Sequence, residues 1–109
     1  MMNSWQNEHN ERQYNLMLDM IFEFKNEKIG IKQLILSLKS LCNALESVPE
    51  SWKNSFNEEW FTLETVYALA LDRQEESLDK KFILTSEEIN IINNTLVNLQ
   101  NLISERKAK

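Results

Sequence analysis

The sequence is almost free of the two residues that most often form turns. It contains one glycine, Gly30, and one proline, Pro49, in 109 residues. Hairpin loops and tight turns depend on these residues, so a sheet-rich fold is disfavoured. At this length the chain can bury one modest core, and we expect a single domain over residues 1–109. We therefore predict an all-α fold, an antiparallel bundle of four to five helices.

The strongest helical pattern lies at residues 31–45. Its apolar residues recur at steps of three and one, which places them on one side of a helix. They are Ile31, Leu34, Ile35, Leu38, Leu41, Cys42 and Leu45. Polar residues fill the opposite side, so this helix should pack its apolar stripe inward. Gly30 is expected at its N-cap, and Pro49 in the first turn of the helix that follows.

Two further stretches have helical periodicity with less certain ends. A first helix is expected over about residues 10–25, with residues 1–9 frayed. Residues 49–73 predict either two helices or one kinked helix. Trp60 and Phe61 cannot both face a core, because neighbours on a helix diverge by about 100°. One of them should lie at the kink or at the surface, and residues 73–81 should form a solvated loop or frayed helix end.

A capping box predicts the start of the last helix. Thr85 is followed three residues later by Glu88, the spacing at which each side chain can bond the other's backbone N–H. The apolar residues then step by three and four, as in a coiled-coil seam suited to packing along another helix. They are Ile89, Ile92, Leu96, Leu99 and Ile103.

Negative charge is concentrated in residues 50–79. This segment has eight acidic and two basic residues, a net charge of −6, whereas the rest of the chain sums to +1. A balanced scaffold with one acidic, aromatic-containing segment has the composition of a surface that binds a basic partner. The candidate binding residues are Glu58, Glu59, Trp60, Phe61, Glu64, Asp72, Glu75 and Glu76. The formal net charge of −5 argues against nucleic acid as the partner.

No arrangement of residues points to catalysis, so we expect no enzyme activity, no cofactor and no metal. The single histidine, His9, lies in a polar stretch and is expected to be exposed and without a role. Cys42 lies on an apolar stripe, where burial would raise the pKa of its thiol and leave it a core residue. Phosphate-binding glycine loops, Cys-x-x-Cys pairs and nucleophile elbows are absent from the sequence.

The sequence also bears on the cellular compartment. The N-terminus lacks the basic start and apolar core of a secretory signal, and no apolar run approaches the ~18 residues of a membrane span. A lone cysteine fits a reducing environment. We therefore expect a cytoplasmic protein that does not enter membranes.

Several short strings in residues 14–72 resemble a known group of proteins. They include Lys28 to Ile31, Ala44 to Glu46, Glu59-Trp60, Leu63-Glu64 and Tyr67 to Asp72, together with Leu34, Leu38, Leu41, Trp52 and Phe56. With this pattern the chain resembles small acidic helical immunity proteins of bacterial contact-dependent growth inhibition and related polymorphic toxin systems. Members of that group often have a polar N-cap residue where this chain has Gly30.

The resemblance implies a cytoplasmic protein that binds the C-terminal domain of a delivered toxin, commonly a nuclease such as an RNase. The acidic surface would then cover the toxin's basic active-site cleft by placing carboxylates where phosphates bind. Two alternatives remain: a helical adaptor or regulatory subunit that dimerises through its last helix, and an enzyme accessory subunit. The sequence leaves the oligomeric state open.

Overall fold

The computed structural model describes residues 4–107, and these residues form four helices with no strand. The helices are α1 (Ser4–Lys25), α2 (Ile31–Asn43), α3 (Glu50–Glu76) and α4 (Ser86–Lys107). The predicted all-α fold is therefore confirmed, with four helices. The molecule is elongated, measuring 55 × 26 × 19 Å along its principal axes.

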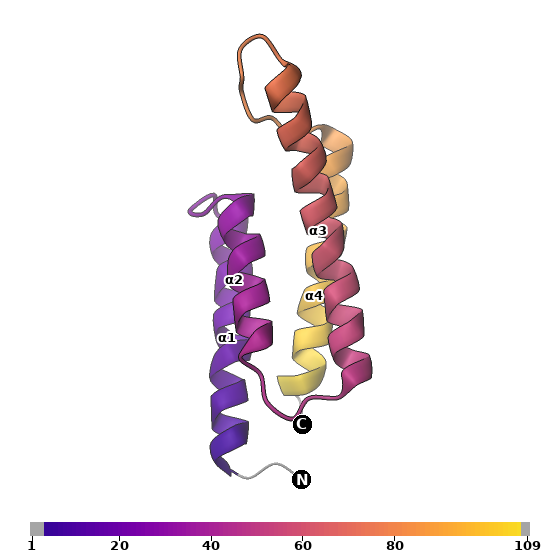
Figure 1. Ribbon diagram of the computed structural model, residues 1–109. Coiled ribbons are helices and arrows are strands. Elements are labelled where there is room, and N and C mark those ends of the chain that lie inside the picture. Colours follow the sequence, from indigo (N-terminus) through magenta and orange to yellow (C-terminus); the bar gives the residue numbers. More distant parts are fainter. Residues whose placement is uncertain (1–3, 108–109) are drawn as a thin grey trace.

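The helices associate as two pairs around one core. Figure 1 shows α1 beside α2 and α3 beside α4, with the chain running upward through α1 and α3 and downward through α2 and α4. Each helix packs against both of its neighbours, because α2 also contacts α3 and α1 contacts α4. The upper end of α3 and the connection at 77–85 extend beyond the α1/α2 pair (Figure 1).

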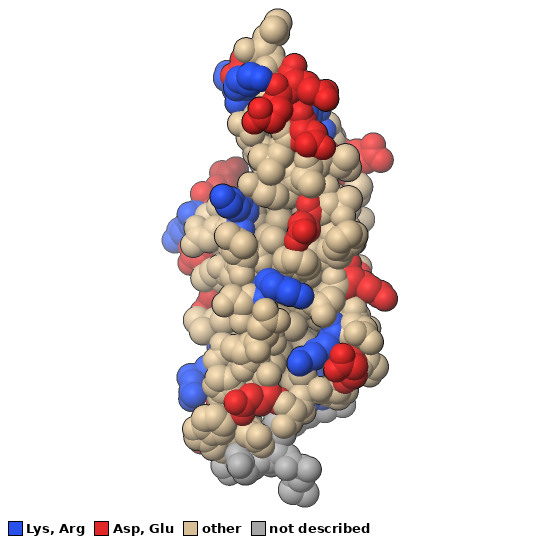
Figure 2. Space-filling model, viewed as in Figure 1, with Lys and Arg blue, Asp and Glu red and all other residues tan. Residues whose placement is uncertain are grey.

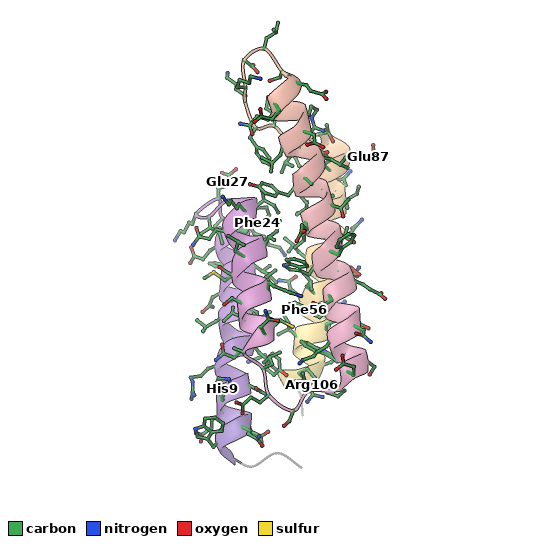
Figure 3. All side chains as sticks on the ribbon, viewed as in Figure 1. His9, Phe24, Glu27, Phe56, Glu87 and Arg106 are labelled. Carbon is green, nitrogen blue, oxygen red and sulfur yellow. The ribbon has the colours of Figure 1, made fainter. Side chains whose placement is uncertain are left out.

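The core is built from the apolar stripes that the sequence predicts. Five residues of the α2 stripe are buried within the helix, and Leu45 is buried just after it. Phe56 is completely buried and points from α3 into the space between the helices (Figure 3). Trp52 packs on it with ring centroids 5.4 Å apart and donates its indole N–H to the Leu102 carbonyl, at 2.8 Å. Burial of these aromatic rings together with the aliphatic side chains around them stabilises the fold.

The beginning of α1 corrects the prediction of a frayed N-terminus. The helix starts at Ser4, and residues 1–3 lie outside the described part of the chain. His9, expected to be exposed and idle, is half-buried; its Nε2 lies 2.6 Å from the Ala44 carbonyl and its ring stacks on Trp5. One turn apart, Trp5 and His9 cover each other, and the bond to the end of α2 anchors this part of α1.

The connection between α1 and α2 places Gly30 where the sequence predicts and turns at Glu27. Gly30 is the N-cap of α2, as predicted, but its backbone is extended and a Cβ there would meet nothing within 4 Å. The left-handed residue in this connection is Glu27, with φ of 60°. Its N–H bonds the Phe24 carbonyl and the N–H of Lys28 bonds Glu23, so the end of α1 is closed by backbone hydrogen bonds.

The region around Pro49 resolves into one long helix. Pro49 is the N-cap of α3 and not part of its first turn, and α3 continues without a break to Glu76. The adjacent pair diverges as helical geometry requires, because Trp60 is half-buried against α2 while Phe61 remains 62% exposed. The predicted loop begins only after Glu76, so Arg73 and Glu75 are helical.

The capping box at the start of α4 is confirmed. The Thr85 N–H donates to Glu88 Oε1 at 2.9 Å, and the Glu88 N–H donates to Thr85 Oγ1 at 3.1 Å. Arg73 of α3 holds the same carboxylate with two hydrogen bonds, at 2.6 and 3.0 Å, and also donates to the Ile83 carbonyl. The hydrogen bonds that Glu88 accepts, first those from Arg73 and then the one from the Thr85 backbone, lower the pKa of Glu88 below its ordinary value. Glu88 therefore joins α3 to the start of α4.

The predicted apolar seam of α4 packs against the other helices of the same chain. Ile92, Leu96, Leu99 and Ile103 are buried in the core, whereas Ile89 is 45% exposed. Thr95 and Glu88 are buried on the same helix, so its inner face is less apolar than the seam suggests.

We expect Glu88→Gln to lower the free energy of unfolding at neutral pH and to matter less in acid. The folded-state pKa of Glu88 lies below its unfolded value, so its stabilisation is complete above the unfolded pKa. It is lost as the pH falls from the ordinary pKa of a glutamate through the lower folded value. Urea titrations at several pH values measure this difference between wild type and variant.

Glu87→Gln is the matched control, because Glu87 lies in the same helical turn, is exposed and has no hydrogen-bond partner within residues 4–107. Its effect on stability should be small at every pH. If the two variants lose stability equally, the junction at Glu88 has no special role.

Candidate protein-binding surface

All eight predicted binding residues lie on α3, but the helix distributes them over different faces. In Figure 2, acidic side chains gather at the upper end of the molecule with basic ones beside them, and lower down they are spread singly. The candidates therefore form separate groups along α3 and do not make one continuous acidic face. Each group has its own surroundings.

The first group lies in a groove between α3 and α4. Glu58 is exposed and Glu59 is half-buried, and Glu59 accepts a hydrogen bond of 2.9 Å from Asn98 Nδ2. The groove has a volume of about 290 Å³, and a third carboxylate, Glu105 of α4, also lines it. The remaining lining residues are Ser55, Asn98, Asn101 and Leu102. Three carboxylates from two helices therefore line one groove, where their negative potentials add.

Glu105 is the residue that sequence reasoning missed. It lies 47 positions after Glu58, and no pattern within either helix links the two. A partial signal was present, because Asn98, Asn101 and Glu105 follow a helical spacing of three and four. That spacing marks a polar stripe on α4, but only the packing of α4 against α3 shows which acids it faces.

Trp60 and Phe61, the two aromatic residues among the candidates, have different surroundings. The Trp60 indole N–H donates to the Ile35 carbonyl of α2 at 2.8 Å, and Lys39 Nζ lies 4.8 Å from the centre of its ring. These contacts tie α3 to α2, so Trp60 serves the scaffold. Phe61 makes no ring contact within residues 4–107 and is largely exposed, which leaves it free to meet a partner.

Glu64 lies apart from the other acids, at a hollow between α2 and α3 that is otherwise mostly apolar. Asp72, Glu75 and Glu76 lie exposed near the C-terminal end of α3. Basic residues intervene there, since Lys80 Nζ donates to the Glu75 carbonyl and Arg73 is paired with Glu88. The charge at this end of α3 is therefore partly balanced.

Cys42, the cysteine considered as a possible nucleophile, belongs to the core. Cys42 is buried in the core, and burial raises the pKa of its thiol, as predicted. No three His, Cys, Asp or Glu side chains in residues 4–107 lie where they could share a metal ion. None of the four helices combines the length and apolar character needed to cross a membrane.

Comparison of the chain with protein-family models, curated proteins and solved structures finds no match. By its structure, the protein is a four-helix all-α domain whose excess negative charge lies on its third helix.

Proposed function

We propose that this protein is an immunity protein that binds and neutralises a toxin domain, most simply a nuclease such as an RNase, in the cytoplasm. In this proposal the antiparallel bundle is a rigid scaffold, and the carboxylates that line the α3/α4 groove contact the toxin's basic cleft. Glu58, Glu59 and Glu105 take the place of the phosphates that a nuclease binds. Phe61, three residues after Glu58 on α3, adds an exposed apolar contact.

The observation that carries the proposal is the position of the charge. Helix α3, residues 50–76, has seven acidic and two basic residues, a net charge of −5, and its outer face is exposed, while the rest of the chain has ten acidic and ten basic residues. Glu75 and Glu76 lie in the last turn of α3, where negative charge opposes the helix dipole and costs stability. Acids that do not stabilise their own helix fit a role in attracting a basic partner, and such attraction speeds association.

The adaptor alternative receives less support. That alternative requires dimerisation through the apolar seam of α4, but four of the five seam residues are buried inside the same chain. A second chain could reach them only if the bundle opened.

The test is a charge reversal in the groove. Glu58→Lys combined with Glu59→Lys should raise the Kd for a basic toxin domain by about tenfold or more, because attraction becomes repulsion. Where the gene directly upstream encodes a large secreted protein, the probe is the C-terminal domain of that protein with its catalytic activity removed. Calorimetry at increasing salt should show binding that weakens steeply for the wild type.

The control changes the same net charge elsewhere. Glu8 and Asp19 are exposed acids on α1, so Glu8→Lys with Asp19→Lys matches the total charge change without touching the groove. Circular dichroism should show equal helix content in both double variants. Equal Kd values for the two would show that the groove is not the binding site, as would a complex in which the toxin grips α1 alone.

A further inference from the structure

A second surface of the molecule is apolar and is not used by the proposed function. Leu36 projects from the outer side of α2 and is 60% exposed. It separates two shallow hollows and lines both of them. One, between α1 and α2, has a volume of about 330 Å³, and the other, between α2 and α3, about 300 Å³. The face carrying α2 and α3 shows a broad uncharged area with only isolated charges (Figure 2).

The walls of these hollows are mainly apolar. Leu16, Met20 and Leu41 line the first, and Ile35, Tyr67, Ala68 and Leu71 line the second. An exposed apolar ridge beside an apolar hollow is a shape that can fit a copy of itself. When two identical surfaces meet across a two-fold axis, the ridge of each can enter the hollow of the other.

The charges at the α2/α3 hollow point to the same occupant. Lys32 lines the hollow from α2, and Glu64 lines it from α3. Neither side chain takes part in a hydrogen bond or ion pair within residues 4–107. Across a two-fold axis, residue i meets residue j and j meets i, so one Lys and one Glu per chain supply two opposite-charge contacts. A basic partner segment would suit Glu64 but would be repelled by Lys32.

We propose that this face binds a second copy of the chain in a two-fold symmetric dimer. Leu36 of each protomer fills the α2/α3 hollow of the other, and Lys32 of each lies against Glu64 of the other. The groove lined by Glu58 and Glu59 lies on the other side of α3, between α3 and α4, so dimerisation does not depend on the proposed function.

The first test measures the mass of the purified chain by sedimentation or light scattering over a range of concentrations. The wild type should reach twice the mass of one chain. Leu36→Asp should remain monomeric, because it places a charge in an apolar contact. Val97→Asp is the matched control, because Val97 is 49% exposed on α4, away from both hollows, and this variant should dimerise normally.

The second test exchanges the charges. Lys32→Glu and Glu64→Lys should each weaken self-association by at least about tenfold, since each creates two like-charge contacts. An equimolar mixture of the two variants should form a heterodimer, because both contacts then become attractive again. Unchanged helix content of each variant shows that the loss is not unfolding.

Three results would overturn the proposal. They are a wild type that stays monomeric at about 1 mM, a dimer that tolerates Leu36→Asp, and a mixture of the charge variants that associates no better than either alone. If this face binds a different protein and not a second copy, the purified wild type will stay monomeric, which is the first of these results.

Discussion

Replacing Phe56 with alanine is expected to lower the free energy of unfolding by about 3–5 kcal/mol. The ring is completely buried and packs against Trp52, so its removal loses apolar burial and leaves a cavity between the helices. A small domain is stable by only about 5–15 kcal/mol, so this loss is a large fraction of the total free energy of unfolding. Urea denaturation followed by circular dichroism at 222 nm, a helix signal, measures the loss.

Phe61→Ala is the matched control on the same helix. Phe61 is 62% exposed, so its removal should change stability by no more than about 0.5 kcal/mol. Similar losses for both variants would mean that Phe56 is not the packed core residue described above. Phe61→Ala should instead weaken binding of the basic partner, which separates stability from function.

Replacing Asn10 with alanine is expected to cost about 2–3 kcal/mol. Asn10 is 2% exposed and binds the backbone of Glu46 twice. Its Nδ2 donates to the Glu46 carbonyl at 2.7 Å, and its Oδ1 accepts from the Glu46 N–H at 2.9 Å. Alanine removes both bonds and leaves two backbone groups at the end of α2 without this partner. Amide hydrogen exchange at Glu46 should accelerate, and the free energy of unfolding should fall.

Two companion variants make this test specific. Asn10→Asp keeps the acceptor for the Glu46 N–H but loses the donor to its carbonyl, so its amide exchange should stay slower than in Asn10→Ala. Asn7→Ala, at an exposed position of α1, should be nearly neutral. If Asn10→Ala were also neutral, the connection at 44–49 would be held by other contacts.

Much of the fold follows from patterns only a few residues long. The stripe of α2 predicts its inward face, and the capping box of Thr85 and Glu88 predicts the start of α4, because each depends on residues within one or two turns. The ends of helices were less accurate. Leu45 continues the apolar pattern, yet α2 ends at Asn43, with the backbone of Glu46 bound to Asn10 and Ser47 in a left-handed conformation.

The candidate site was predicted in composition and not in arrangement. The acids are on α3, as expected, but an uninterrupted helix turns Glu58 and Glu59 toward α4 and leaves Glu64 at the hollow beside α2. A break within residues 49–73 would have changed which way these acids face, so their separation depends on the helix being continuous. Trp60 was predicted as a binding residue, whereas its indole N–H bonds the Ile35 carbonyl of α2, a contact that no short sequence pattern reveals.

By itself the sequence determined which segments are helical, which side of each is apolar and where the negative charge is concentrated. These properties depend on residues within about one helical turn of each other. Only the tertiary structure decided that His9 meets Ala44, that Asn10 holds Glu46 and that Glu105 joins Glu58 in one groove. Such contacts join residues far apart in the chain, and they depend on the register and rotation with which whole helices pack against one another.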